Sequence, residues 1–254
     1  MRLSIADVIL RVSHDYGPKE DPGVAPESAE ADLRRSLGPG GASHRASTST
    51  HFSEAEALVE WERKCGRLLE RDEWLGPVRD GGMEHDLWFN ERWQRFVKIT
   101  RPGGFGRFPK IINRKISMRS ASPLEYLERL RHSNELFADD WRVVGVLIDN
   151  GLVRMVTSQP LIVGERPAQA DIDSYMNALG FERVAEEKAY RHNQQLLGVF
   201  DTHKGNFLKT CDGQVFAIDV IPAKLTLETN RLFQDLQIAY RSWPDEYPGP
   251  PAAT

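Results

Sequence analysis

The stretch GVFDTHKGNFLKTCDGQVFAIDV, residues 198–220, constrains the fold of this chain more than any other. Polar side chains occur in it among apolar residues that are typical of buried strands and turns: Asp201, His203, Asn206 and Asp219. A polar group is costly to bury unless a partner satisfies it. The fold must therefore bring partners to these side chains, which share one short segment.

The composition is that of an ordinary globular protein. The chain has 254 residues, enough for one large domain or two lobes with a core. Its net charge of -4 gives no global reason to expect nucleic-acid binding. No apolar run approaches the roughly 20 residues of a membrane span, and the two cysteines suggest no disulfide framework. We expect a cytoplasmic monomer that binds neither nucleic acid nor membrane.

Residues 17–50 are rich in Gly, Pro, Ser and charge, which predicts a flexible linker. A helix is expected from Ser53, because Ser53 and Glu56 form the pattern of a capping box. We therefore divide the chain into a flexible segment (1–52), a first lobe (53–161) and a second lobe (162–254).

The remaining patterns alternate strands and helices. They predict two or three antiparallel strands within 76–108, a capped helix at 122–137, a hairpin turning at 149–151, and helices near 168–184 and 225–240. A small sheet with one helix inserted, followed by a mainly helical half, is the layout of a two-lobed phosphotransferase. The predicted fold class is α+β.

The spacing of Asp201 and Asn206 is the D-x-x-x-x-N of a kinase catalytic loop, in which the Asp accepts or orients the hydroxyl and the Asn holds Mg²⁺. Asp219 ends the apolar run VFAID, where it can supply a second metal ligand. Asp and Asn also favour turns, and Asp212-Gly213 is interpreted as one. The combination of the loop, a turn and a second Asp favours the functional interpretation.

These residues resemble two related families. DTHKGNFL and FAID resemble the D-x-H-x-G-N…I-D pattern of aminoglycoside-phosphotransferase-type kinases. Together with RFVKIT, YLERLRHSNELF and VTSQPLIVG, they are also similar to the serine/threonine/tyrosine kinase domain of polyvalent proteins of phages and mobile elements. The resemblance covers about residues 53–240. It departs at Phe200, before Asp201, and at Val220-Ile221, after Asp219.

The resemblance implies a two-lobed, protein-kinase-like fold with a small antiparallel-sheet N-lobe and a short, mainly helical C-lobe. It implies ATP and Mg²⁺ as cofactors. In RFVKIT, Lys98 matches the strand lysine that holds the α- and β-phosphates, although a strand lysine can also extend to solvent. Its glutamate partner is expected to be Glu128, with Glu135 in reserve, because Glu125 belongs to the predicted capping box of the 122–137 helix.

The remaining assignments concern the nucleotide. Gly81 and Gly82 would let backbone N–H groups approach phosphate, although they do not form the G-x-G-x-x-G pattern. The backbone groups of Gln159 and Leu161 are candidates for the adenine edge, beside the strand break at Pro160. His203 is expected to brace the catalytic loop.

The leading interpretation is an ATP- and Mg²⁺-dependent kinase acting on protein Ser, Thr or Tyr hydroxyls, with Asp201 and Lys98 as catalytic residues and Asn206 and Asp219 as metal ligands. A small-molecule kinase of the aminoglycoside type is an alternative, because it shares the D-x-H-x-G-N form. A catalytically inactive nucleotide-binding scaffold is another. Such a scaffold would have no need of the Asp201 carboxylate.

Overall fold

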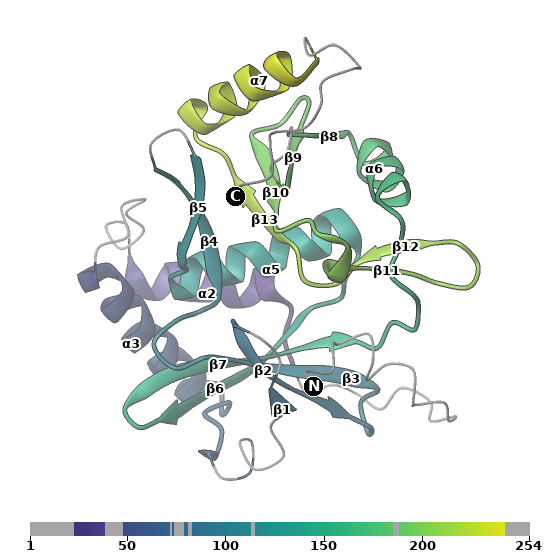
Figure 1. Cartoon of the computed structure of the whole chain (residues 1–254). Helices are drawn as coiled ribbons and strands as arrows, with labels where there is room; N and C mark the ends of the chain where they lie inside the picture. The colour runs from purple at the N-terminus through teal and green to yellow at the C-terminus, as the bar shows by residue number, and fades with distance from the viewer. Residues whose placement is uncertain are drawn as a thin grey trace, which may run out of the picture.

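The computed structural model describes residues 23–38, 48–71, 73, 79–80, 83–112, 115–184 and 188–241 (Figure 1). The helices of this part of the chain are α2 (Pro26–Leu37), α3 (Thr48–Lys64), α5 (Pro123–Phe137), α6 (Gln169–Ala178) and α7 (Leu227–Arg241). The strands of the first half are β1 (Arg79–Asp80), β2 (His85–Asn90), β3 (Arg95–Thr100), β4 (Arg107–Ile112), β5 (Lys115–Ser120), β6 (Arg142–Asp149) and β7 (Leu152–Pro160). Those of the second half are β8 (Phe181–Arg183), β9 (Ala189–His192), β10 (Leu197–Phe200), β11 (Phe207–Lys209), β12 (Val215–Ala217) and β13 (Ile221–Lys224).

Strands of the first half form a five-stranded antiparallel sheet in the order β1-β2-β3-β7-β6. Asn150 and Gly151 join β6 to β7 with φ angles of 50° and 79°, which suit a two-residue hairpin turn. The prediction of this hairpin is confirmed, and so is the prediction of a strand at RFVKIT.

The two faces of this sheet meet different partners, because side chains alternate along a strand. Val97 and Ile99 of β3 face an apolar cluster formed within the sheet region. Phe96 and Lys98 lie on the opposite face, which is turned toward the second half of the chain. On that side one apolar cluster joins the two halves: Leu87, Phe96, Leu208 and Ile218.

Helix α5 is inserted between the β4–β5 hairpin and β6, and it begins as predicted. The Ser122 side chain accepts a hydrogen bond from the Glu125 N–H, and the Glu125 carboxylate accepts one from the Ser122 N–H. Pro123 occupies the first turn, where its missing N–H costs nothing. The β4–β5 hairpin was not predicted as a hairpin of its own.

Helix α2 corrects the interpretation of residues 17–50 as a flexible linker. The helix packs against α5 and α3 (Figure 1). Ala29 and Leu33 are fully buried in the same core as Leu127 of α5. The buried residues of this helix are Pro26, Ala29, Glu30 and Leu33. They are few among the polar and charged residues of 17–50, so the average composition of the segment did not reveal them. Residues 17–22 and 39–47 lie outside the described residues.

Helix α3 also differs from the expectation, because it begins at Thr48 and Ser53 lies inside it. The Ser53–Glu56 pattern therefore does not mark the first turn of this helix. A Ser and a Glu at capping-box spacing do not by themselves show that a helix begins there, because the helix can extend further toward the N-terminus.

The second half is not mainly helical, contrary to the predicted C-lobe. Alongside α6 and α7 it contains a four-stranded sheet in the order β13-β10-β9-β8 and the two-stranded hairpin β11–β12. Each of these strands has only three or four residues, which is too short to give a clear alternation of apolar and polar residues. The helices that were predicted, α6 and α7, are present. The division into two lobes at residues 161 and 162 stays a prediction.

Within the described part of the chain, none of the helices combines the length and the apolar character needed to cross a membrane.

Candidate active site

The candidate catalytic loop follows directly from strand β10. Asp201 has a φ of 55°, a conformation that is uncommon outside glycine but better tolerated by Asp and Asn. The Asn206 Nδ2 donates hydrogen bonds to the Asp201 backbone oxygen at 2.7 Å and to its Oδ2 at 3.1 Å. The Asp201 side chain remains 42 % exposed, so its carboxylate is both oriented by the loop and accessible to a substrate.

His203 braces this loop, as the sequence predicted. Its Nδ1 accepts a hydrogen bond from the Gly205 N–H at 3.0 Å. A Cβ at Gly205 would lie 2.9 Å from His203 Cε1, so only glycine leaves the imidazole ring in this place. The short helical turn Lys204–Asn206 then leads into β11.

The β11–β12 hairpin brings Asn206 next to the residues around Asp219. Phe207 pairs with Ala217 in its register, and the Ile218 N–H donates to the Asn206 carbonyl oxygen at 2.9 Å. The predicted turn at Asp212-Gly213 closes this hairpin, with Gly213 at a φ of 89°. Asn206 and Asp219, the two predicted metal ligands, are therefore neighbours in space.

Lys98 reaches the same place from the sheet. Its Nζ lies 3.3 Å from the Ile218 carbonyl oxygen and 3.4 Å from Asp219 Oδ1. It also lies 4.3 Å from the centroid of the Trp141 ring. Burial lowers the pKa of Lys98, and the Asp219 charge partly offsets this effect. Burial opposes ionisation of Asp219 too, but Lys98 and Arg129 outweigh it, and the pKa of Asp219 falls below its usual value.

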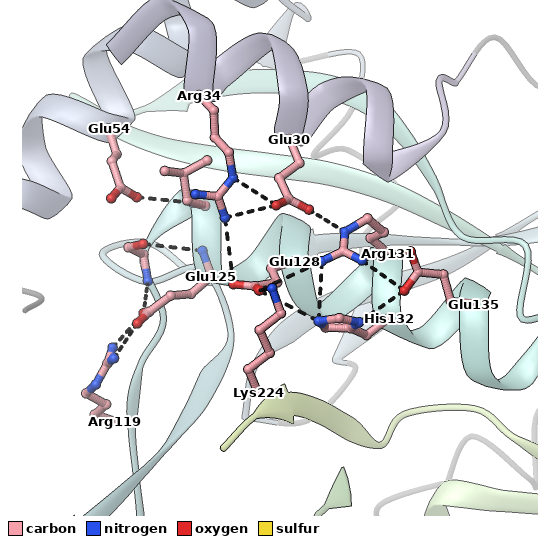
Figure 2. A network of polar contacts seen from close by, with 12 residues as sticks. Glu30, Arg34, Glu54, Arg119, Glu125, Glu128, Arg131, His132, Glu135 and Lys224 are labelled. Carbon is pink, nitrogen blue, oxygen red and sulfur yellow. Dashed lines mark hydrogen bonds and ion pairs between the residues drawn. The ribbon is translucent and has the colours of Figure 1, made fainter. Parts of the chain in front are cut away.

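Glu128 does not pair with Lys98, contrary to the sequence prediction. It belongs to a network on another face of α5, which Figure 2 shows. Its carboxylate lies 3.3 Å from Lys224 Nζ and 3.6 Å from His132 Nε2. A hydrogen bond with His132 lowers the pKa of Glu128 to about 2.

The reserve choice, Glu135, lies in the same network, paired with Arg131 and His132 (Figure 2). The physical reason for both errors is helical geometry. Successive residues on a helix point about 100° apart, so Glu128, one position before Arg129, and Glu135, six positions after it, both lie on other faces.

The residue of α5 that faces the site is Arg129, which the sequence analysis missed. Its side chain is 3 % exposed, with Nη1 at 2.7 Å from Glu84 Oε2 and Nη2 at 3.4 Å from Asp219 Oδ1. The sequence offered one signal: an arginine among the apolar positions of the helix, flanked by Leu127 and Leu130. No pattern in the sequence around Glu84 predicted its ion pair with Arg129, because that pair forms only when α5 packs nearby.

A recess lies between the sheet and the β11–β12 hairpin, with a volume of about 310 Å³ including space open to solvent. Its apolar lining includes Leu87, Phe96, Ile162, Leu208 and Ile218. Its polar lining side chains are Lys98 and Gln159. The recess therefore has apolar walls from both halves of the chain and a cation on its lining.

Gln159 contributes an unsatisfied donor to this recess. Its side chain is 4 % exposed, and its Nε2 has no hydrogen-bond partner among the described residues. A buried donor without a partner is rare and calls for an explanation. The Leu161 N–H, which was also assigned to a base edge, already donates to the Gln94 carbonyl oxygen at 3.1 Å.

Gly81 and Gly82 lie outside the described residues, in the connection between β1 and β2. Arg101, which follows β3, forms an ion pair with Asp86 at 2.7 Å.

Oxygen ligands for a cation are available from Asn206 and Asp219. Since the Asn206 Nδ2 is directed at Asp201, its amide oxygen points away from Asp201. Within the described ranges, His, Cys, Asp and Glu form no group of three or more suited to a metal ion. Mg²⁺ is usually bound by one or two carboxylates plus substrate phosphates, and Asp219 provides a ligand of that kind.

Comparison with known proteins gives one match. A family model described as a serine/threonine/tyrosine kinase found in polyvalent proteins matches residues 53–225. The matched range covers more than half of the chain and includes Lys98, Asp201, Asn206 and Asp219. No curated protein and no solved structure matches the chain.

Proposed function

The chain belongs to the serine/threonine/tyrosine kinase family found in polyvalent proteins, and we propose that it transfers the γ-phosphoryl group of ATP to hydroxyl groups of proteins. One observation carries the proposal. Lys98 contacts the segment at Ile218 and Asp219 across more than a hundred residues of sequence, and that segment is bonded to the loop of Asp201 and Asn206. A phosphoryl transferase needs a phosphate-binding cation, metal ligands and a base in one place.

The recess suits the base of a nucleotide. The apolar faces of Phe96 and Leu208 would enclose a planar ring, and the Gln159 amide would gain the acceptor that it lacks. Lys98 lies on the same lining, where the phosphates would follow.

Asn206 and Asp219 are the residues that would hold Mg²⁺. The ion would neutralise charge on the phosphate oxygens, which is the main requirement of phosphoryl transfer.

Asp201 would act on the acceptor. The hydroxyl oxygen forms a bond to the γ-phosphorus, and the bond from that phosphorus to the β–γ bridging oxygen breaks, releasing ADP. The hydroxyl proton passes to the Asp201 carboxylate, which Asn206 holds in place. The accessibility of this carboxylate suits an acceptor that arrives from solvent, such as a protein side chain.

The test replaces Asp201 by Ala. Because the base acts when the phosphoryl group moves, Asp201→Ala should bind Mg·ATP nearly as well as wild type. Its rate of transfer should fall by about 10²–10⁴-fold, the usual contribution of a positioned base. Titration calorimetry measures the binding, and transfer from γ-labelled ATP measures the rate.

Asp212→Ala is the matched control, since Asp212 is an exposed aspartate at the turn of the β11–β12 hairpin. It should keep the wild-type rate. Near-normal transfer by Asp201→Ala would refute the assignment of the loop and favour a nucleotide-binding scaffold. Transfer to an aminoglycoside but to no protein would favour the small-molecule alternative.

A further inference from the structure

Arg129 places a second buried cation beside Lys98. Helix α5 runs between the sheet and the second half of the chain (Figure 1) and directs this residue at Asp219. The Arg129 side chain is 3 % exposed and that of Lys98 is 5 % exposed. Burying two cations so close together is costly unless anions accompany them.

The two ends of the Arg129 guanidinium are held differently. Nη1 lies 2.7 Å from Glu84 Oε2, a separation normal for charge-assisted hydrogen bonds, which span about 2.7–2.9 Å. Nη2 lies 3.4 Å from Asp219 Oδ1, well beyond that range. Glu84 therefore anchors the arginine, whereas Asp219 is a loose and exchangeable partner.

Lys98 has the same loose contact. Its Nζ also lies 3.4 Å from Asp219 Oδ1, so two buried cations converge on one carboxylate oxygen. If Asp219 ligates a metal ion, as proposed above, its charge is shared with that ion. Arg129 and Lys98 then need another anion at the place to which both already point.

We propose that Arg129, together with Lys98, binds a phosphate group of the nucleotide. The planar guanidinium matches two oxygens of a phosphate, and its Glu84 anchor holds it in orientation. Helix α5 thus contributes a cation to the site in place of the carboxylate that the sequence predicted at Glu128. This inference rests on the proposed function, because it takes the ligand to be a nucleoside di- or triphosphate.

The alternative is that Arg129 only orients Asp219 for the metal ion. The two roles differ in what they require. Direct contact with phosphate strengthens ATP binding with or without Mg²⁺, whereas orientation of a metal ligand matters only when Mg²⁺ is present. In neither role would Arg129 affect the binding of a ligand without phosphates, such as adenosine.

The experiment titrates the full chain with ATP plus Mg²⁺, ATP plus a chelator, and adenosine. Arg129→Gln should weaken ATP binding by about 10- to 100-fold, the range for a lost hydrogen bond to a charged group, and equally with and without Mg²⁺. Adenosine affinity should stay at the wild-type value. Arg129→Lys should give an intermediate loss for ATP.

Two variants serve as controls. Arg131→Gln removes the same charge from the same helix, but Arg131 pairs with Glu30 and Glu135 outside the site, so ATP affinity should not change. The double variant Glu84→Gln/Arg129→Gln removes both charges of the anchoring pair. It keeps the test valid if Arg129→Gln fails to fold because Glu84 is left unpaired.

The outcomes are distinct. Failure of wild type to bind ATP overturns the proposed function. If wild type binds ATP and Arg129→Gln binds it equally well, only the assignment of Arg129 is wrong. If Arg129→Gln loses ATP affinity only when Mg²⁺ is present, Arg129 orients Asp219. If it loses affinity for adenosine as much as for ATP, its role is structural. Either result overturns phosphate binding by Arg129.

Discussion

Asp201 owes its position to Asn206. A residue other than glycine at a φ of 55° is in a disfavoured conformation, so the surrounding structure must hold it there. Asn206 does this by donating to both the backbone and the carboxylate of Asp201. The Asn206 amide therefore fixes the direction of the proposed base, in addition to its proposed role as a metal ligand.

Asn206→Asp tests this relation. The change replaces the donating amide with a carboxylate facing the Asp201 carboxylate, and like charges raise the pKa of one of the two. We expect transfer to fall by about 10²-fold or more, within the range for a positioned base. Because the base must be ionised, the acidic limb of the rate–pH profile should move to higher pH.

Asn150→Asp is the control, since Asn150 lies in the β6–β7 turn, where Asp is equally suited. Its profile should match that of wild type. An Asn206→Asp variant with an unmoved acidic limb and a near-normal rate would show that Asn206 does not set the ionisation of Asp201.

Helix α5 shows which elements the sequence can predict. Its capping box and the Asn150-Gly151 hairpin were predicted, because the residues that form each feature are adjacent in the sequence. Helix α2 was missed, because it is stabilised by packing of Ala29 and Leu33 against α5, which is distant in the sequence. The short strands of the second half were missed for the same reason. They are strands because they pair with other strands, and they are too short for their sequence to show a periodic pattern.

Leu33→Ala tests the docking of α2. Leu33 is fully buried, so its truncation should lower the free energy of unfolding by about 2–5 kcal/mol. The matched control is Leu227→Ala, because Leu227 is 65 % exposed and should lose little. Denaturant unfolding measures both. Equal, small losses would show that α2 is not part of the folded core and would restore the interpretation as a flexible segment.

Asp139, between α5 and β6, should make the stability of the folded protein depend on pH. Its Oδ2 accepts a hydrogen bond from Ser133 Oγ at 2.7 Å, but its buried Oδ1 has no partner in the described part of the chain. Burial raises the pKa of Asp139 from 3.8 to about 7. Between about pH 4 and pH 7 the folded state thus retains a proton that the unfolded state has lost, and stability falls as pH rises.

Asp139→Asn should remove this penalty. One pKa unit corresponds to about 1.4 kcal/mol, so the variant should be more stable than wild type by on the order of 1–3 kcal/mol at pH 8. The difference should shrink toward pH 5, where wild-type Asp139 is protonated in the folded state. Denaturant unfolding at both pH values is the measurement. A difference that is the same at both would rule out titration of Asp139 as its source.

The site shows the same limit of sequence reasoning. Asp201 and Asn206 were predicted from their spacing, Asp219 from its place at the end of an apolar run, and Lys98 from the resemblance to kinases. The structure brings them together through contacts of Lys98 with Asp219 and of Asn206 with Asp201. Their neighbours were not predictable. Which residue of α5 faces the site depends on how the helix is rotated about its axis when it packs against the sheet. The sequence does not specify this rotation, so Glu128 was predicted where the structure has Arg129.

The molecule as a whole joins two sets of strands around α5. Figure 1 shows the five-stranded sheet on one side of this helix and the strands β8–β10 and β13 with α7 on the other. The β11–β12 hairpin and the residues after it connect the sheet to the second half of the chain. The connections include the Lys98 contacts with Ile218 and Asp219, and the apolar cluster that contains Phe96 and Leu208. The recess and the candidate catalytic loop lie at this junction, where movement of the sheet relative to the second half would alter the distances from Lys98 to Ile218 and Asp219.

The most direct test of the central claim is the fate of the γ-phosphoryl group. The full chain is incubated with γ-labelled ATP and Mg²⁺, alone and with cell lysate, beside the Asp201→Ala variant. We predict label on Ser, Thr or Tyr of protein, formed by wild type and lost with Asp201→Ala. Absence of labelled protein with wild type, or equal labelling by the variant, would contradict the account.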